Sequence, residues 1–227
     1  MKIIIINGSP RSNGATGQVL SKISETIGKM DSNIEIESID LAKLNLLFCT
    51  GCAACYKTGR CHIQEDGIED LSRKIEECDG VILGSPTYAS NVSAQFKILI
   101  DRGHFIFEQL LKNKACFSVV TYANYGGGEA QKVINNLIQR SGGAARCKYM
   151  IKINHGDTAL NDQRNKHIER LCHKFVLSLN KKNPSSFYDK LVSTIAFNMV
   201  IKPYVFKNRS QYKGVISRWV EQGLIPE

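Results

Sequence analysis

The chain has 227 residues, enough for one well-buried core with a terminal extension but short for two full domains. Hydrophobic residues make up 43% of it and charged residues 22%, which is the balance of a soluble globular protein that folds by itself. The formal net charge of +9 suits anionic cofactors, an acidic redox partner, nucleic acid or a membrane surface, and charge alone does not choose among them.

The start of the chain does not have the charged, apolar and small-residue order of a signal peptide, because four isoleucines run straight into a turn. No uninterrupted apolar run reaches the length of a membrane span, since even 191–201 contains polar residues and ends at Lys202 and Pro203. We therefore expect a cytoplasmic protein. Its eight cysteines then indicate reduced thiols, metal ligands or redox chemistry rather than disulfides.

Short apolar runs rich in β-branched residues alternate with stretches of helical periodicity. The runs predict buried parallel strands at 3–6, 34–39, 81–83, 116–120 and 149–153. The periodic stretches predict helices at 16–29, 68–77, 93–102, 129–140 and 161–180, and Asp66 and Ser93 are the expected N-caps. Because this alternation implies right-handed crossovers, we predict an α/β fold with a doubly wound five-stranded parallel sheet in the order 2-1-3-4-5.

The predicted organisation is one domain over 1–182 and a C-terminal helical extension over 183–227. An apolar helical stripe in the extension is expected to break at Pro203; its members are Leu191, Val192, Ile195, Ala196, Met199 and Val200. A second helix is expected around Trp219. The extension also carries much of the basic excess. Two interpretations stay open: it packs on its own or a partner subunit, or it is a basic amphipathic contact with a membrane or another protein.

The loop after the first strand, "NGSPRSNGATGQVL", has the composition of an anion site. In a doubly wound sheet ligands bind beyond the carboxyl ends of the strands, where the winding reverses. Backbone amides at the start of the following helix, with the hydroxyls of Ser9, Ser12 and Thr16 and the guanidinium of Arg11, would form a phosphate cradle. The loop has neither the dinucleotide fingerprint nor a P-loop motif, so a phosphate monoester is the favoured ligand. Taken alone, the loop leaves open the alternative of a polar strand-to-helix turn that binds nothing.

Aromatic residues and glycines follow the third and fourth strands. Pro86 stiffens the first of these loops, and Tyr88 is placed to lie against a flat ring. The second loop has Tyr122, Tyr125 and a glycine triplet. Together with the phosphate cradle, these loops predict a site for a planar phosphorylated cofactor, although each tyrosine could instead simply pack on its loop.

Two stretches, "IIINGSPRSNGATGQVL" and "GSPTYASNVSAQFKILIDR", resemble the hallmark loops of the NADPH-dependent FMN reductase family. The resemblance covers about residues 1–180 and implies a flavodoxin-like fold that binds FMN, usually as a homodimer, and is reduced by NADH or NADPH. Matched by position, the FMN phosphate would be held by Ser9, Arg11, Asn13, Ala15 and Thr16. The isoalloxazine would be flanked by Pro86, Thr87, Tyr88, Asn91, Val92 and Ser93, and its edge would meet Ala123, Asn124 or Tyr125.

Hydride transfer from nicotinamide to flavin needs orientation of the two rings rather than a side-chain acid or base. We therefore name no catalytic side chain, and each of the five histidines is interpreted as structural or solvent-exposed. In members of the family an asparagine often precedes the threonine of the first loop. Ala15 departs from that pattern, so a backbone amide would replace one side-chain contact to the phosphate.

Four cysteines lie in a short segment after the second strand with the spacing C-x2-C-x2-C-x5-C: Cys49, Cys52, Cys55 and Cys61. Zinc ribbons separate two ligand pairs by a dozen or more residues, whereas a compact all-thiolate run suits a [4Fe-4S] cluster. The spacing resembles that of the iron-sulfur flavoproteins, a branch of the same family in which these cysteines hold a cluster close to FMN. Relatives without a cluster share the pattern, so cluster, free thiols and zinc all stay open.

The predicted function is an FMN-dependent NAD(P)H oxidoreductase that passes electrons to a quinone, a flavin or a protein acceptor, directly or through a [4Fe-4S] cluster. The alternative is an iron-sulfur flavoprotein that carries electrons and is reduced by ferredoxin rather than by a nicotinamide nucleotide. A homodimer is expected. No nucleic-acid motif is recognisable, so no nucleic-acid partner is predicted.

Overall fold

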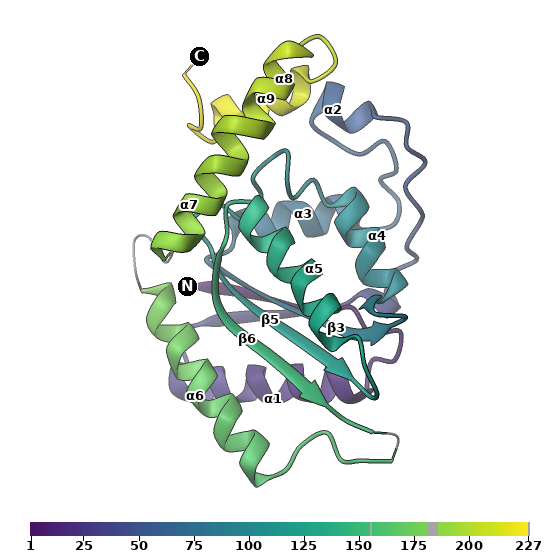
Figure 1. The fold of residues 1–227 in the computed structure, drawn as a ribbon, viewed down its shortest axis with the longest axis vertical. Helices are drawn as coiled ribbons and strands as arrows, with labels where there is room; N and C mark the ends of the chain where they lie inside the picture. The colour runs from purple at the N-terminus through teal and green to yellow at the C-terminus, as the bar shows by residue number, and fades with distance from the viewer. Residues whose placement is uncertain (155, 181–185, 227) are drawn as a thin grey trace.

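A parallel sheet forms the centre of the computed structural model, which describes residues 1–154, 156–180 and 186–226 (Figure 1). Its five main strands are β1 Lys2–Asn7, β2 Glu35–Asp40, β3 Gly80–Tyr88, β5 Ala115–Tyr122 and β6 Ala144–Lys152. They follow the order β2-β1-β3-β5-β6, which is the predicted one. The short strand β4, Asn91–Val92, was not expected and pairs antiparallel with the end of β3.

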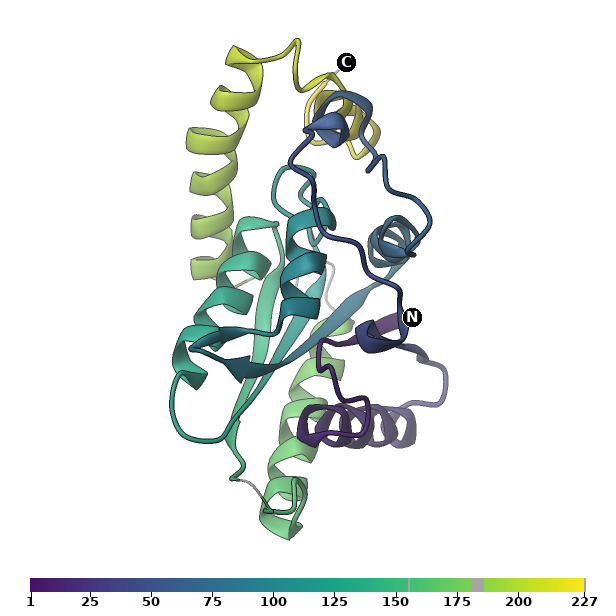
Figure 2. The same cartoon turned by 90° about the vertical axis from the view of Figure 1, so that its right-hand side faces the viewer.

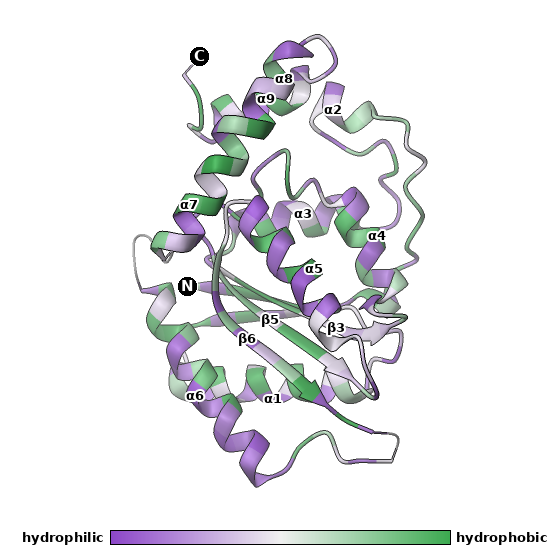
Figure 3. Cartoon of the chain, viewed as in Figure 1, coloured by the Kyte–Doolittle hydropathy of each residue, from purple (hydrophilic) through white to green (hydrophobic). Residues whose placement is uncertain are grey.

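Helices cover both faces of the sheet. On one face lie α1 (Ala15–Met30) and α6 (Asp162–Leu179), and on the other lie α3 (Ile68–Glu77), α4 (Ala94–Arg102) and α5 (Gly127–Arg140). The isoleucines of β1 alternate between the two cores: Ile3 and Ile5 face α1 and α6, while Ile4 and Ile6 face α3 to α5. A central strand must be apolar on both faces, which is why this run is continuous. Along these helices, hydrophobic and hydrophilic residues follow one another, as expected for amphipathic helices (Figure 3).

Several local predictions differ from the structure at element boundaries. Strand β3 runs to Tyr88, five residues past the predicted run at 81–83. Strand β6 starts five residues before the predicted run at 149–153, because it is an edge strand whose exposed side breaks the apolar pattern. Ser93 caps α4 as predicted, with its Oγ accepting a hydrogen bond from Phe96 N at 3.1 Å. Asp66 is not the N-cap of α3, which is Gly67 in a left-handed conformation; the Asp66 carboxylate pairs with Arg102 and still accepts a hydrogen bond from Ile68 N at 3.3 Å.

The C-terminal segment contains α7 (Phe187–Ile195), a π-helical turn η2 (Ala196–Ile201), α8 (Lys202–Lys207) and α9 (Lys213–Glu221). The predicted break at Pro203 is wrong, because the helix continues through it. Lys202 N donates to Phe197 O, five residues back, and this wider turn accommodates the proline ring that would clash in a regular helix. The predicted domain boundary at 182/183 lies outside the described residues and stays a prediction.

The C-terminal segment packs on its own chain. Trp219 is fully buried, and its Nε1 donates to Phe107 O at 2.6 Å. Trp219 belongs to a separate apolar cluster, whose buried members are Ile201, Val205, Tyr212, Val215, Trp219 and Ile225. This supports the first interpretation of the extension. In the part of the chain that the structure describes, no helix is long and apolar enough to cross a membrane.

Candidate functional site

Three segments meet at the carboxyl ends of β1, β3 and β5: the first loop (8–14), the second loop (85–93, which includes the end of β3, a tight turn and strand β4) and the third loop (123–126). Gly8 N donates to Gly84 O at 2.8 Å, and the Ser93 hydroxyl donates to Gly8 O, so the first loop is fastened to the second. The third loop touches the second, because a Cβ atom on Gly126 would lie 2.7 Å from the Cα of Ser90. The structure thus brings together the three loops that the sequence predicted as one site.

The first loop lies directly against the start of α1. A Cβ atom on Gly17 would be 1.9 Å from Ser12 O, so only glycine fits there. The N-cap of α1, Gly14, has no side-chain hydrogen bond within the described residues, and the first turn has no acidic residue. Backbone N–H groups at this helix start are therefore available to an anion.

The predicted phosphate residues differ in their surroundings. Arg11 and Asn13 are exposed, whereas Ser9 and Thr16 are buried. Ser9 Oγ accepts a hydrogen bond from Arg11 N at 3.1 Å, and the Thr16 hydroxyl lies 2.7 Å from that of Thr121. Each of these hydroxyls has capacity for a further bond. Ala15 is half-buried in the first turn, where only its backbone N–H can face an anion.

Backbone strain marks the tip of the second loop. Ala89 and Ser90 have φ values of 47° and 61°, although neither is glycine. Such residues cost about 1–3 kcal/mol each and cluster at functional sites. The turn exposes Tyr88, at 43%, and Asn91. The other predicted ring contacts lie deeper, with Thr87 half-buried and with Pro86, Val92 and Ser93 buried.

The third loop is largely exposed. Ala123 and Asn124 are open to solvent, and the Tyr125 side chain is 76% exposed. Tyr122 instead packs within its own loop, because a Cβ atom on Gly127 would meet its ring at 2.6 Å. Tyr88 and Tyr125 are therefore the exposed tyrosines of these loops that can cover a flat ring. Tyr122 instead packs on its own loop, which is the alternative that the sequence left open.

The position of the cysteine segment after the second strand suggested that it would lie at this edge of the sheet. The structure differs from that expectation. The segment runs away through residues 44–53 to the short helix α2 (Ala54–Thr58), which packs against α9 (Figures 1 and 2). Cys61 lies beside Arg102, at the far end of α4 from Ser93. The nine residues of α4 span about 13 Å, which separates Cys61 from the three loops.

The cysteine segment changes direction between each pair of successive cysteines. Gly51, Ala53 and Gly59 all have left-handed backbone conformations, one in each interval. Cys49 and Cys52 are exposed, Cys55 is half-buried and Cys61 is buried. Burial, together with the nearby charges of Cys61, Cys52 and Cys49, raises the pKa of Cys55 to about 11. The four thiols thus range from exposed to buried along one segment.

Cys52 differs from Cys55 in its electrostatics. The backbone N–H of Ala54 stabilises its thiolate and lowers the pKa of Cys52. Its Sγ lies 3.2 Å from Nδ1 of His62. Among residues 1–154, 156–180 and 186–226, no three His, Cys, Asp or Glu side chains are close enough to hold a single metal ion. A cubane makes a different demand, because each thiolate binds a different iron atom.

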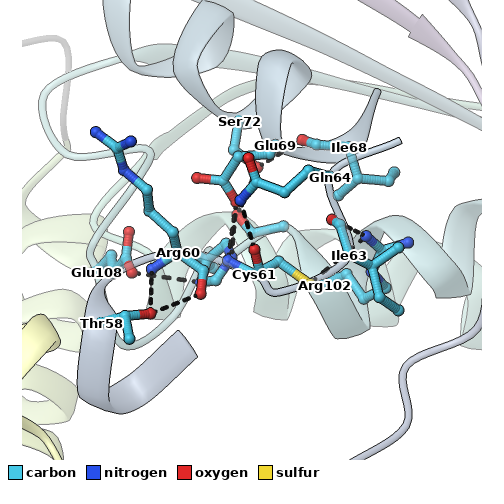
Figure 4. A network of polar contacts seen from close by, with 12 residues as sticks. Thr58, Arg60, Cys61, Ile63, Gln64, Ile68, Glu69, Ser72, Arg102 and Glu108 are labelled. Atoms are coloured by element: carbon cyan, nitrogen blue, oxygen red, sulfur yellow. Dashed lines mark hydrogen bonds and ion pairs between the residues drawn. The ribbon is translucent and has the colours of Figure 1, made fainter. Parts of the chain in front are cut away.

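A buried ion pair anchors the end of the segment. The Arg102 and Asp66 side chains are each 1% exposed and form a charge-assisted contact. Arg102 also donates to Leu47 O at 2.8 Å. It donates to Ile63 O at 2.9 Å, and its Nη2 lies 3.5 Å from Cys61 Sγ (Figure 4). The guanidinium group of Arg102 thus places a fixed positive charge next to this sulfur.

The sequence profile of the NADPH-dependent FMN reductase family matches residues 1–146. The chain belongs to this family. An iron-sulfur flavoprotein of Clostridioides difficile is 39% identical over 225 residues, which cover 99% of this chain and 100% of that protein. Membership of the family makes FMN-dependent oxidoreduction the class of reaction.

Solved structures agree in fold. An NADH:FMN oxidoreductase in its apo form superimposes with a TM-score of 0.59 at 18% identity, over 79% of this chain and 90% of that one. Oxidised flavodoxin 1 from Bacillus cereus gives 0.53 at 18% identity, over 78% and 98%. The fold is therefore flavodoxin-like, as the resemblance of the two loops implied.

Two polar residues that support the loops of this family member were not predicted. Asn7, at the end of β1, accepts a hydrogen bond from Ser9 N at 3.0 Å and donates to Ser12 O at 3.3 Å. Thr121, at the end of β5, bonds to Thr16. The position of each at a strand end was visible in the sequence, but their partners were not.

His104 is a further residue that the sequence did not single out. Its side chain is 6% exposed and lies between Glu69, at 3.4 Å, and Glu108, at 3.3 Å. Burial alone would lower the pKa of His104, but the two carboxylates outweigh it and raise the pKa to about 9. The residue is therefore a buried imidazolium at neutral pH.

A pH-dependent stability follows from His104. Because its folded pKa is raised, its contribution is fully present below about pH 6.5 and is lost as the pH rises through about 9. We expect up to about 3 kcal/mol of stability to be lost over this window. Urea denaturation of wild type and His104→Gln across pH 6 to 10 measures it. Equal slopes in the two proteins would contradict the assignment.

Proposed function

We propose that the chain is an FMN-dependent NAD(P)H oxidoreductase that passes electrons to a quinone, a flavin or a protein acceptor. The observation that carries the proposal is the joining of three loops at one sheet edge, where a helix start without a side-chain cap lies near exposed tyrosines. Bound FMN would accept a hydride from NADPH or NADH and release electrons singly or in pairs.

The residues proposed to hold FMN fall into two groups. The backbone amides at the start of α1, together with Ser9, Arg11, Asn13, Ala15 and Thr16, would bind the phosphate. Pro86, Thr87, Tyr88, Asn91, Val92, Ser93 and Ala123 would flank the ring, with Tyr88 shielding one face from water. The contact of Ser93 would be indirect, because its hydroxyl already joins the second loop to Gly8.

We further propose that Cys49, Cys52, Cys55 and Cys61 hold a [4Fe-4S] cluster. The donor set is all thiolate, and a left-handed turn lies between each pair of successive cysteines. The name of the Clostridioides difficile relative supports the same reading over the whole length of the chain. A bound cluster would accept electrons one at a time. Arg102, which lies beside Cys61, would compensate part of the negative charge of the cluster.

Two further features of the proposal concern assembly and location. Exposed apolar residues on α7, η2 and α8, led by Phe187 at 84% and Met199 at 72%, support the expected homodimer. All eight cysteines are free thiols, which supports a cytoplasmic location.

Anaerobic titration with NADPH and NADH tests the proposed electron donor. The flavin absorbance near its visible maximum is expected to bleach in proportion to added nucleotide. If reduced ferredoxin bleaches the flavin and neither nucleotide does so, the chain is instead an electron carrier of iron-sulfur flavoprotein type.

Replacing Cys52 tests the cysteine segment. Cys52→Ala is expected to lose most of its iron and acid-labile sulfide while it retains FMN, because the segment is separate from the three loops. Lys57→Ala, an exposed change in the same segment, is the control and should keep both cofactors. Iron retained at the wild-type level in Cys52→Ala would remove this residue from the ligand set.

A further inference from the structure

The C-terminal helix α9 docks on the cysteine segment through a direct backbone contact. A Cβ atom on Gly214 would lie 2.0 Å from Gly59 N and 2.5 Å from the carbonyl carbon of Thr58. Gly59 ends α2 with a φ of 74°, between Cys55 and Cys61. The approach therefore depends on glycine at position 214, and it holds the turn that separates the last two cysteines.

Aromatic rings reinforce this contact. Tyr56 follows Cys55 directly, and its ring stacks on that of Tyr212 with centroids 4.8 Å apart and an interplanar angle of 22°. Phe107 meets the edge of Tyr56 at 5.0 Å. Stacked and edge-on pairs of this kind add stabilisation beyond the area that they bury. The turn of chain that carries Cys55 is therefore fixed to the residue that precedes α9.

A chain of charged contacts runs from α9 to Cys61. Arg218 pairs with Glu76 at 2.5 Å, and its Nε lies 3.5 Å from Glu108. Glu108 contacts His104, which contacts Glu69. Glu69 in turn accepts a hydrogen bond from Cys61 N at 3.1 Å (Figure 4). The contacts of Arg218 Nε with Glu108 and of His104 with its two carboxylates are ion pairs without hydrogen-bond geometry, so these groups are linked by charge.

These contacts reach two of the four cysteines. Cys55 and Cys61 lie on either side of the turn at Gly59 and are shielded, whereas Cys49 and Cys52 precede α2 and are exposed. The family profile ends at residue 146, so α9 lies beyond the part of the chain that matches it. The cysteine segment therefore depends on an element outside the family core.

We infer that α9 is a positioning element of the cysteine site: Gly214, Tyr212 and Arg218 hold the segment that carries Cys55 and Cys61 and limit access to these two thiols. When the proposed cluster is bound, the same contacts slow its loss. The positioning of the thiols does not rest on the proposed function, whereas the retention of a cluster does.

The first test uses Gly214→Ala, with Lys213→Ala as its control. Alanine favours the helix itself, but its Cβ cannot fit against Gly59, whereas Lys213 is exposed on the same helix. In anaerobically purified protein we measure iron release to a chelator, and in the same protein after its iron has been removed we measure alkylation of each cysteine by iodoacetamide with peptide mapping. Gly214→Ala should release iron and expose Cys55 and Cys61 to alkylation about tenfold faster, with little change at Cys49 and Cys52.

The second test separates positioning from a general loss of stability. Arg218→Met removes the charge that pairs with Glu76 and Glu108, and Arg218→Lys restores a positive charge at the same place. Faster alkylation of Cys61 in Arg218→Met, with rescue in Arg218→Lys and FMN retained in both, is the expected result. If Gly214→Ala does not fold, this second pair of variants still tests whether α9 positions the cysteine segment.

Wild-type alkylation rates at Cys55 and Cys61 in folded Gly214→Ala or Arg218→Met would overturn the inference, as would an equal increase at all four cysteines. If the wild-type protein contains no iron, the proposed cluster fails, and the alkylation rates still decide whether α9 positions the thiols.

Discussion

Replacing Gly17 by alanine is expected to weaken FMN binding by about tenfold to a hundredfold, in line with the usual cost of overpacking. The added Cβ atom would lie 1.9 Å from Ser12 O. This oxygen belongs to the backbone and cannot rotate away, so the first loop must move off the start of α1. Titration of the apoprotein with FMN, followed by quenching of flavin fluorescence, measures the effect.

Gly28→Ala is the matched control for this prediction. Gly28 lies in the same helix with nothing within 4 Å of its would-be Cβ atom. Alanine there should stabilise the protein by up to about 1 kcal/mol and leave FMN binding unchanged. If the two variants bind FMN equally well, the first loop is not the phosphate site.

Removing the buried charge of Arg102 is expected to destabilise the protein by about 3–5 kcal/mol. In Arg102→Met the carboxylate of Asp66, 1% exposed, is left without its main partner, and the carbonyl oxygens of Leu47 and Ile63 each lose a donor. Urea denaturation measures the change. Arg73→Met is the control, because Arg73 forms exposed ion pairs with Asp70 and Glu77 and should cost less than about 1 kcal/mol.

The same ion pair predicts acid sensitivity. Burial would raise the pKa of Asp66, but Arg102 and two backbone N–H groups outweigh it and hold the pKa below its usual value. The stabilisation is therefore present above about pH 4 and is lost as the pH falls through the lowered pKa. A loss on Arg102→Met no larger than that on Arg73→Met would contradict the role given to this pair.

The sheet could be predicted because its signals are local. A run of four isoleucines in β1 indicates a strand buried on both faces, and alternation with amphipathic helices leaves few topologies. Where the prediction failed, backbone conformations without a clear sequence signal decided the structure. Asp66 has the sequence position of an N-cap, but Gly67 takes that place in a left-handed conformation, while the Asp66 carboxylate bonds both to Ile68 N and to Arg102, 36 residues later. Pro203 stays within a helix because the preceding π-helical turn makes room for it.

The candidate site was predictable in its loops and less so in its details. Gly8 and Pro86 mark turns after strands, and parallel topology alone brings such turns to one edge. The bond between Thr16 and Thr121 joins residues 105 positions apart, and no local pattern shows it. The place of the cysteine segment depends in the same way on Gly214, which contacts Gly59 across more than half of the chain.

Cofactor content after anaerobic purification tests the central claim most directly. Flavin, iron and acid-labile sulfide are measured per chain on the same sample. We expect one FMN with about four iron and about four sulfide atoms per chain, and an absorbance spectrum of flavin over a broad iron-sulfur background. A colourless protein that takes up neither FMN nor iron would contradict it.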